Sequence, residues 1–373
     1  MESKLTANKN ESNQDIFFRD ILYPDTIDSH VHLFHCSLEG VWDLIDFEKK
    51  LGYKAFNYLS CECMDDLAQN ALGIYLKLIA PDNYAYGGLH YRYSYDFAKE
   101  AQMLMELGFD GMKMVENKPT LRKHLNMATN DPRYDEFYAY MEQTKAPMII
   151  HVADPEEFWD ENVIPEWALS AGYYYGDGSF VSKEQIYEET LSVLERYPKL
   201  SITFAHFFFL SGDRDRLSKI LDRYPSVGLD IVSGTEMYFN FTKDPLGWRD
   251  FFLKYQDRII FGTDNMNLYD PMDIDNALIV NRFEHEFIRT DNQIPAWDKT
   301  IQGIGLPNEV QRKIFKTNFQ KLAGDKPKPI RLDAAMDYLD GRLKDEKLNL
   351  TNREVYIIQS VYNLCKEHKA ANI

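Results

Sequence analysis

The 373-residue sequence contains little cysteine and none of it in paired motifs. The four cysteines are Cys36, Cys61, Cys63 and Cys365. They show no paired CxxC spacing, so the sequence indicates neither a disulfide framework nor a structural zinc module. Sparse, unpaired cysteine fits a reducing compartment, so we expect a cytoplasmic protein.

The sequence also has fewer basic than acidic residues, and it contains no long apolar run. Lysine and arginine number 42 against 59 acidic residues, a formal net charge of −17. This balance argues against nucleic acid or an anionic membrane as the main partner. The first 15 residues are polar and lack the apolar core of a signal peptide, and no later run is long enough to cross a bilayer. A soluble protein that acts on a small molecule is therefore expected, and a homo-oligomer is left open.

What the sequence does contain is enough apolar material for a large core, with 45% hydrophobic and 14% aromatic residues. Short apolar runs alternate with longer segments of helical periodicity, a pattern typical of βα units around a parallel sheet. Eight strands are predicted, at residues 25–32, 54–60, 84–91, 109–115, 146–152, 200–207, 226–232 and 258–264. Helices are predicted at 64–79, 94–107, 133–144, 183–196, 213–224, 246–256 and 308–322. Eight such units match a (β/α)₈ TIM barrel in the α/β class.

The barrel is expected to carry three additions. Residues 1–19 are interpreted as a flexible tail, 20–324 as the catalytic barrel, and 325–373 as a helical extension whose Thr351–Glu354 segment forms a capping box. A long loop follows the fifth strand, and an insertion follows the eighth. Loops of this length are uncommon unless they cover a site, and both follow the carboxyl ends of strands, where barrel enzymes place their active sites.

Ionisable residues stand at or near the carboxyl ends of five predicted strands. They are His30, His32, Lys113, His151, His206 and Asp264. Taken singly, each has an ordinary explanation, such as a hydrogen-bonded core histidine or a capping aspartate. A parallel barrel, however, brings all of its strand ends to one mouth. Together they form a set of imidazole and carboxylate ligands suited to a catalytic divalent ion.

This constellation resembles the amidohydrolase superfamily, in its amidohydrolase-related branch of metal-dependent barrels. The resemblance rests on "DSHVH" ending at His32, "IIH" at His151, "ITFAH" at His206, "IIFGTD" at Asp264, and a closing helix at 306–324. It implies one divalent ion, usually zinc and sometimes manganese. The implied metal ligands are His30, His32, His151 and Asp264, with His206 as a further ligand or a catalytic histidine. In binuclear relatives a carboxylated lysine bridges two ions, and Lys113 stands at a comparable place.

The first functional hypothesis is a metal-dependent hydrolase, in which Asp264 deprotonates a metal-activated water and His206 supports the developing charge on a carbonyl substrate. The alternative is a non-oxidative decarboxylase of an aromatic or unsaturated acid. Arg92 and Lys113 would then bind the carboxylate, and Phe207 and Trp159 would form apolar walls, unless these aromatics simply pack the long loop. A third reading is a metal-binding barrel that serves as a non-catalytic scaffold.

Overall fold

The computed structural model describes residues 25–93, 96–266 and 271–371, so the predicted tail at 1–19 lies outside the described residues. All eight predicted strands are confirmed. They are β1 (Ile27–Val31), β2 (Ala55–Leu59), β3 (Tyr84–Gly88), β4 (Gly111–Asn117), β5 (Met148–Val152), β6 (Ile202–Phe204), β7 (Val227–Asp230) and β8 (Ile259–Ile260). Most of their residues are buried, as is usual in a parallel sheet that helices cover.

The strands form one parallel sheet in the order β1 to β8. The sheet closes between its first and last strands, because the amide of Ser29 donates to the carbonyl of Phe261 at 3.1 Å and the amide of Asp264 donates to the carbonyl of His30 at 2.9 Å. The fold is therefore the expected (β/α)₈ barrel.

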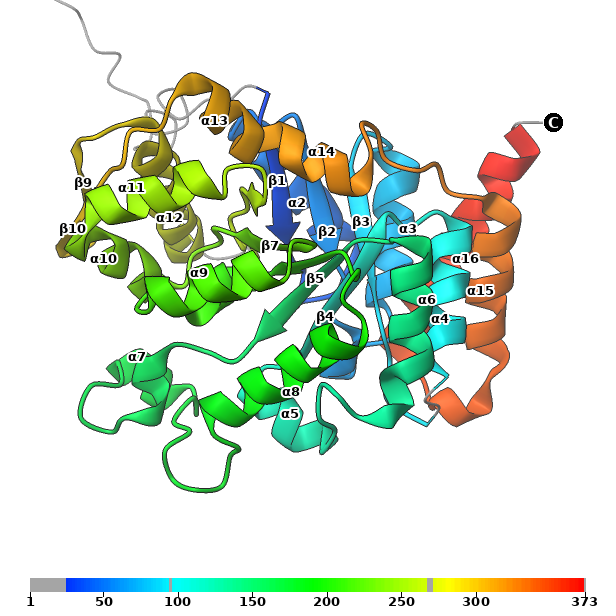
Figure 1. Ribbon diagram of the computed structural model, residues 1–373. Helices are drawn as coiled ribbons and strands as arrows, with labels where there is room; N and C mark the ends of the chain where they lie inside the picture. The colour runs from blue at the N-terminus through cyan, green and yellow to red at the C-terminus, as the bar shows by residue number, and fades with distance from the viewer. Residues whose placement is uncertain (1–24, 94–95, 267–270, 372–373) are drawn as a thin grey trace, which may run out of the picture.

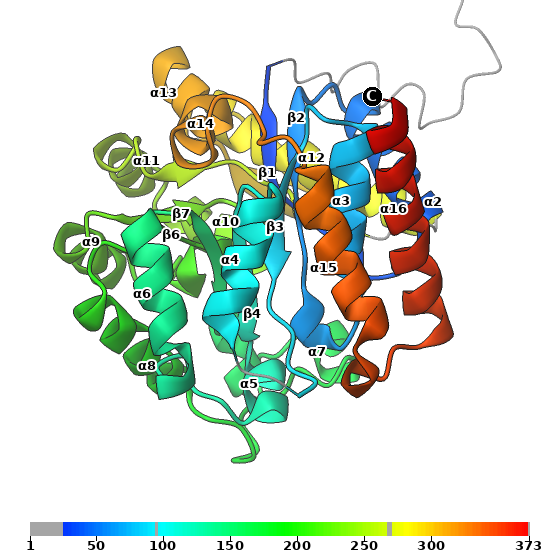
Figure 2. The ribbon, with the colours of Figure 1, turned by 90° about the vertical axis from the view of Figure 1, so that its right-hand side faces the viewer.

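Helices surround this barrel (Figures 1 and 2). They are α2 (Leu38–Lys50), α3 (Gln69–Ile79), α4 (Phe97–Leu107), α5 (Pro119–Leu125), α6 (Asp135–Thr144), α7 (Glu166–Ser170), α8 (Lys183–Arg196), α9 (Arg214–Arg223), α10 (Thr235–Lys243), α11 (Pro245–Lys254), α12 (Pro271–Arg289), α13 (Asn308–Arg312), α14 (Asn318–Ala323), α15 (Leu332–Lys344) and α16 (Asn352–Ala371). No described helix is long and apolar enough to span a membrane.

The interior of the barrel is filled and closed at the amino ends of its strands. Phe319 on α14 packs edge-on against Tyr84 of β3, with ring centroids 5.0 Å apart, and lies over Tyr86. Figure 1 shows α13 and α14 at this end and α7 at the end toward which the strands point. The opening is therefore at the carboxyl ends, on the side of α7.

Within the described residues, both long segments expected to cover that opening contain small structures of their own. The loop after β5 contains α7 and a local cluster centred on Phe158, Ala168 and Tyr175. The insertion after β8 contains α12 and an antiparallel hairpin of β9 (Gln293–Ala296) and β10 (Lys299–Gln302). Sequence periodicity did not predict α2, α5, α7, α10 or α12.

The predicted helical extension consists of α15 and α16, which pack on α4 and α3 respectively. Figure 2 shows the two helices side by side against that face of the barrel. The predicted capping box is present, because the amide of Glu354 donates to Thr351 Oγ1 at 3.2 Å and the amide of Thr351 donates to Glu354 Oε2 at 2.7 Å. The extension thus covers the outside of the barrel, away from its opening.

Candidate metal centre and its cavity

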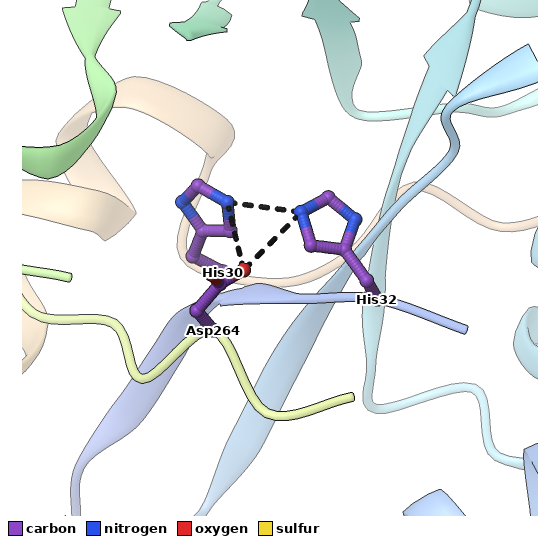
Figure 3. A group of neighbouring side chains, drawn as sticks. All are labelled: His30, His32 and Asp264. Carbon is purple, nitrogen blue, oxygen red and sulfur yellow. Dashed lines mark hydrogen bonds and ion pairs between the residues drawn. The ribbon is translucent and has the colours of Figure 1, made fainter. Parts of the chain in front are cut away.

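Three side chains from β1 and the end of β8 converge at the carboxyl end of the barrel (Figure 3). The Nε2 atoms of His30 and His32 are 3.1 Å apart. Asp264 Oδ1 lies 3.6 Å from His30 Nε2 and 3.5 Å from His32 Nε2. The alternation of a strand places the two histidines on one face of β1, as their spacing predicts.

The opposite nitrogen of each histidine ring is held by an acceptor. His30 Nδ1 lies 2.9 Å from Asp230 Oδ2, and His32 Nδ1 lies 2.9 Å from the carbonyl oxygen of Leu59. A proton on each Nδ1 leaves both Nε2 lone pairs directed at the point of convergence. Burial lowers the pKa of both histidines well below 6.5, and nearby positive groups lower it further, so both rings are neutral at pH 7.

The backbone conformation and its contacts hold Asp264 beside β1. Its φ of 59° lies in the left-handed region, which is costly for a residue other than glycine. Its amide bond to the His30 carbonyl, given above, holds it beside β1. Gly262 permits this approach, because a Cβ there would lie 2.8 Å from the Cβ of His30. Burial raises the pKa of Asp264 to about 7, against the opposing effect of Lys113.

The geometry of these three groups fits a divalent ion. A tetrahedral ion with bonds of about 2.0–2.1 Å requires its ligand atoms to lie about 3.3–3.4 Å apart. The three observed separations of 3.1, 3.5 and 3.6 Å bracket that value. Neutral imidazole nitrogens and a carboxylate oxygen are also donors that such an ion takes in proteins. His30, His32 and Asp264 therefore have both the spacing and the donor chemistry of a metal site.

Lys113 of β4 reaches into the same centre. Its Nζ lies 3.1 Å from His30 Nε2, and its side chain is buried. Burial lowers the pKa of this lysine, although the surrounding carboxylates and Cys61 oppose the effect. A lysine beside a candidate ligand atom can bind an anionic group of a substrate or contribute to a second ion site.

His206 follows β6 on a strained turn. His206, Phe207, Phe208 and Phe209 have φ values of 52°, 56°, 60° and 48°. Such a left-handed run is rare for bulky residues and persists only where other contacts hold it. Here Asp230 Oδ1 accepts the amide of His206 at 2.7 Å, and the Tyr187 hydroxyl donates to the carbonyl of Phe208 at 2.9 Å.

The turn directs the His206 ring toward the centre. Its centroid lies 5.6 Å from that of His30 and 4.9 Å from that of His151. Its buried Nδ1 has no hydrogen-bond partner within the part of the chain that the structure describes. Burial lowers the pKa of His206 well below 6.5, so a neutral ring with an uncommitted nitrogen faces the site.

His151 of β5 lies beside the centre but is engaged by a second network. Its Nε2 is 3.1 Å from Asp154 Oδ1, and it is not part of the group of converging ligand atoms. Asp154 also accepts both a bond of 2.6 Å from the Tyr175 hydroxyl and two bonds of 2.9 Å from Lys118 Nζ. Burial alone would raise the pKa of Asp154, but Lys118 and His151 outweigh it and hold the pKa below its ordinary value.

A cavity of about 1300 Å³ opens at this centre. Its polar lining includes His32, Lys113, Lys118, His151, Asp154, His206 and Asp264. The loop after β5 and the hairpin after β8 both contribute to the wall, as their position after strand ends predicts. The volume exceeds the roughly 300–1000 Å³ of ordinary ligand pockets.

Three residues proposed from the sequence as substrate contacts lie elsewhere. Arg92 binds Glu354 at 2.7 Å and Asp65 at 2.7 Å, and so joins the barrel to the helical extension. Phe207 is fully buried and stacks on Phe252 in the outer core, because the left-handed turn points it away from the opening. Trp159 packs beneath the loop against Tyr175, with centroids 4.9 Å apart. These three residues are therefore not among the side chains that line the cavity.

Sequence reasoning also overlooked functional neighbours. Asp230 ends β7, and Lys118 follows β4, so the rule that identified the other strand-end residues would have identified both. Asp154 follows His151 by three residues, a spacing that could have suggested a partner. Asp28, at the start of the "DSHVH" segment, accepts the backbone amides of His30 and Thr263 at 3.0 and 3.1 Å and so joins the ends of β1 and β8.

Comparison with known proteins gives a family and a fold. The family model described as Amidohydrolase matches residues 92–322. No curated protein matches the sequence closely enough to count as a relative. Among solved structures, a candidate amidohydrolase from Staphylococcus aureus aligns with a TM-score of 0.53 and 16% identity, covering 80% of this chain and 99% of that chain.

Two further structures resemble the chain at lower identity. The apo form of IDCase from Metarhizium anisopliae aligns with a TM-score of 0.50 and 11% identity over 80% of this chain and 97% of that one. The 5-carboxyvanillate decarboxylase LigW from Sphingomonas paucimobilis aligns with a TM-score of 0.49 and 12% identity over 81% and 99%. At such identities the likeness concerns the fold alone.

Proposed function

The chain belongs to the amidohydrolase family, and from that membership we propose that it is a metal-dependent hydrolase of a small carbonyl substrate. The observation that carries the proposal is the convergence of His30, His32 and Asp264 at the spacing of a tetrahedral ion. A bound divalent ion would polarise the substrate carbonyl and lower the pKa of a water molecule toward neutrality. We propose zinc, with manganese as the second choice, and His151 as an additional ligand.

The side chains of this chain would then supply the proton transfers. Asp264 accepts the proton of the attacking water, a role that suits a carboxylate placed at the point where the two histidines converge. His206 is neutral and has an uncommitted Nδ1, so it can hold or carry a proton at the reacting group. Lys113 places positive charge in the same cavity, where it would stabilise a developing oxyanion.

A non-oxidative decarboxylase is the second candidate, and the two cavity lysines favour it. Lys113 Nζ is bonded to a neutral imidazole nitrogen rather than to a carboxylate. Lys118 is partly exposed to the cavity while it binds Asp154. Together they would hold the carboxylate of an acidic substrate. Release of CO₂ from a panel of aromatic and unsaturated acids would favour this reaction over hydrolysis.

Metal analysis of the purified protein is the first test. We expect one zinc or manganese ion per chain by elemental analysis, and a loss of the ion in His32→Ala. Two ions per chain would instead assign Lys113 to a second metal site. A protein that takes up no divalent ion would refute the proposed function.

Turnover is the second test, on a panel of esters, lactones and amides with metal-loaded protein. Asp264→Asn should lower kcat by about 10²–10⁴-fold, the usual contribution of a general base. Asp298 is an exposed carboxylate that lines the same cavity, so Asp298→Asn is the matched control and should keep the rate within a few-fold. A metal-dependent rate that survives in Asp264→Asn would refute the base assignment, and metal binding without turnover of any substrate would favour the scaffold reading.

A further inference from the structure

The outer part of the cavity differs from its inner end. The inner end is lined by imidazole, carboxylate and ammonium groups, whereas the rest of the lining combines apolar side chains with polar ones such as Asn240, Lys243 and Asp298. We call four of the apolar side chains, Val163, Trp167, Phe239 and Trp297, the apolar rim. Val163 and Trp167 belong to the loop after β5, Phe239 belongs to α10, and Trp297 belongs to the hairpin after β8.

Exposed apolar side chains gather at this cavity. In the described part of the chain, ten large apolar side chains are exposed, and four of them, Met64, Val163, Trp167 and Trp297, line it. Single exposed apolar residues are ordinary on a protein surface, but a group of them around one opening marks a binding site. Trp167 and Trp297 are 58% and 44% exposed, so both keep a large part of their apolar area available to a ligand.

Trp297 is held in position at a conformational cost. It is the first residue of the two-residue turn between Ala296 and Lys299, and its φ is 53°. Such turns favour asparagine or glycine, which adopt positive φ readily, over a bulky aromatic residue. The indole Nε1 donates to Asn276 Oδ1 at 3.2 Å, and the ring packs edge-on against Phe283 at 5.6 Å. Strain of this kind is commonly found at ligand sites.

The loop after β5 supplies the second tryptophan on a supported base. Trp167 packs edge-on against Phe158, with centroids 5.6 Å apart. The neighbouring Tyr173 also lines the cavity, and Lys118 Nζ lies 4.6 Å from its ring centroid. The loop is tied to the inner end through the bond from Tyr175 to Asp154. The apolar wall is therefore continuous with the polar site rather than a separate surface patch.

We infer that the apolar rim is a binding subsite for the apolar body of the substrate, so that the substrate is amphipathic, with a polar acyl or carboxylate group at the metal centre and an alkyl or aryl body against Trp297 and Trp167. This inference rests on the proposed function for the inner end only. The cavity has room for such a molecule, since its volume of about 1300 Å³ is more than a small polar group needs.

Unreactive carboxylic acids of increasing length test the inference. Calorimetric titration of the metal-loaded full chain with acetate, butanoate, hexanoate and octanoate should show affinity rising with length. The rise should reach up to about fourfold per methylene, since a buried methylene contributes about 0.8 kcal/mol. Comparison of octanoate with 2-naphthoate then distinguishes an alkyl body from an aryl body, and tight binding of either supports the subsite.

Variants locate the subsite. Trp297→Ala should weaken octanoate binding about 5- to 10-fold and leave acetate binding unchanged, whereas Trp297→Phe should retain most of the affinity. Trp167→Ala provides a second, independent truncation, in the loop after β5. Trp42 is 51% exposed on α2, outside the cavity lining, and bonded to Tyr75, so Trp42→Ala is the control and should change neither affinity.

The inference would be overturned if affinity did not depend on the length of the acid, or if no acid bound. It would also be overturned if affinity rose equally with acid length in Trp297→Ala and in the wild type. These failures differ from failure of the proposed function. A protein that binds no metal but still favours the longer acids would keep the subsite and lose the hydrolase. A metal-loaded hydrolase with no length dependence would do the reverse.

Discussion

Two regions of this barrel bury ionisable side chains, and they arrange them differently. At the junction between the barrel and the helical extension, Arg342 binds Glu62 at 2.8 Å and Glu100 at 2.5 Å. The charges there are paired with each other. At the candidate metal centre, two neutral histidines and Asp264 direct acceptor atoms at one point.

The difference separates a structural network from a site. A buried group costs free energy unless it is paired, so a network that satisfies its own charges needs nothing further. At the candidate centre, by contrast, the three donor atoms stand at the spacing of a tetrahedral ion, with Lys113 Nζ 3.1 Å from His30 Nε2. Arg92 illustrates the distinction, because its guanidinium is saturated by Asp65 and Glu354 and has nothing left to offer a substrate.

The largest expected effect in this comparison is the removal of the junction cation. Arg342→Met leaves Glu62 and Glu100 without their partner. The free energy of unfolding, measured in urea, should fall by about 3–5 kcal/mol, as for other broken buried pairs. Metal stoichiometry should stay unchanged at temperatures where the variant is folded. Loss of the metal in folded Arg342→Met would show that the two regions are coupled.

A smaller effect is expected from the outer partner of His30. Asp230→Asn weakens the acceptor at His30 Nδ1, and metal affinity measured by chelator competition should fall about 10- to 100-fold. Asp110 is buried before β4 and bonded to Lys77, so Asp110→Asn controls for lost stability alone. Unchanged metal affinity in Asp230→Asn would contradict the orienting role of this carboxylate.

The smallest effect concerns Glu354, which ties the extension to Arg92. Burial raises the pKa of Glu354, but bonds from the amides of Thr351 and Leu67 and from Arg92 outweigh it and hold the pKa below 4.5. The unfolded chain then binds the proton more readily, so the stabilisation is present above about pH 4.5 and is lost as the pH falls through the lowered pKa.

Glu354→Gln should therefore cost about 1–2 kcal/mol at pH 7, in line with lost hydrogen bonds to charged groups. The difference from the wild type should shrink as the pH is lowered below about 4.5. Thermal unfolding across that range measures it. A difference that grows on acidification would contradict the assignment.

Much of the fold was predictable because parallel strands have a strong local signature. The eight strands were confirmed, and the structure has helices within or closely matching all of the predicted ranges, 64–79, 94–107, 133–144, 183–196, 213–224, 246–256 and 308–322. The helices that escaped prediction include α7 and α10, which lie in segments around the opening where apolar residues line the cavity as well as the core. In these segments apolar residues occur on more than one face of the helix, so helical periodicity does not identify the buried face.

The sequence by itself determined the barrel and the convergence of His30, His32 and Asp264, because strand alternation and strand ends follow from short-range spacing. The tertiary structure decided the rest. It turned His151 toward Asp154, gave His30 its partner Asp230, and used a left-handed turn to direct Phe207 into the core. These outcomes depend on side-chain rotamers and on backbone angles, and contacts with residues distant in the sequence hold both in place. A local sequence pattern therefore does not predict them.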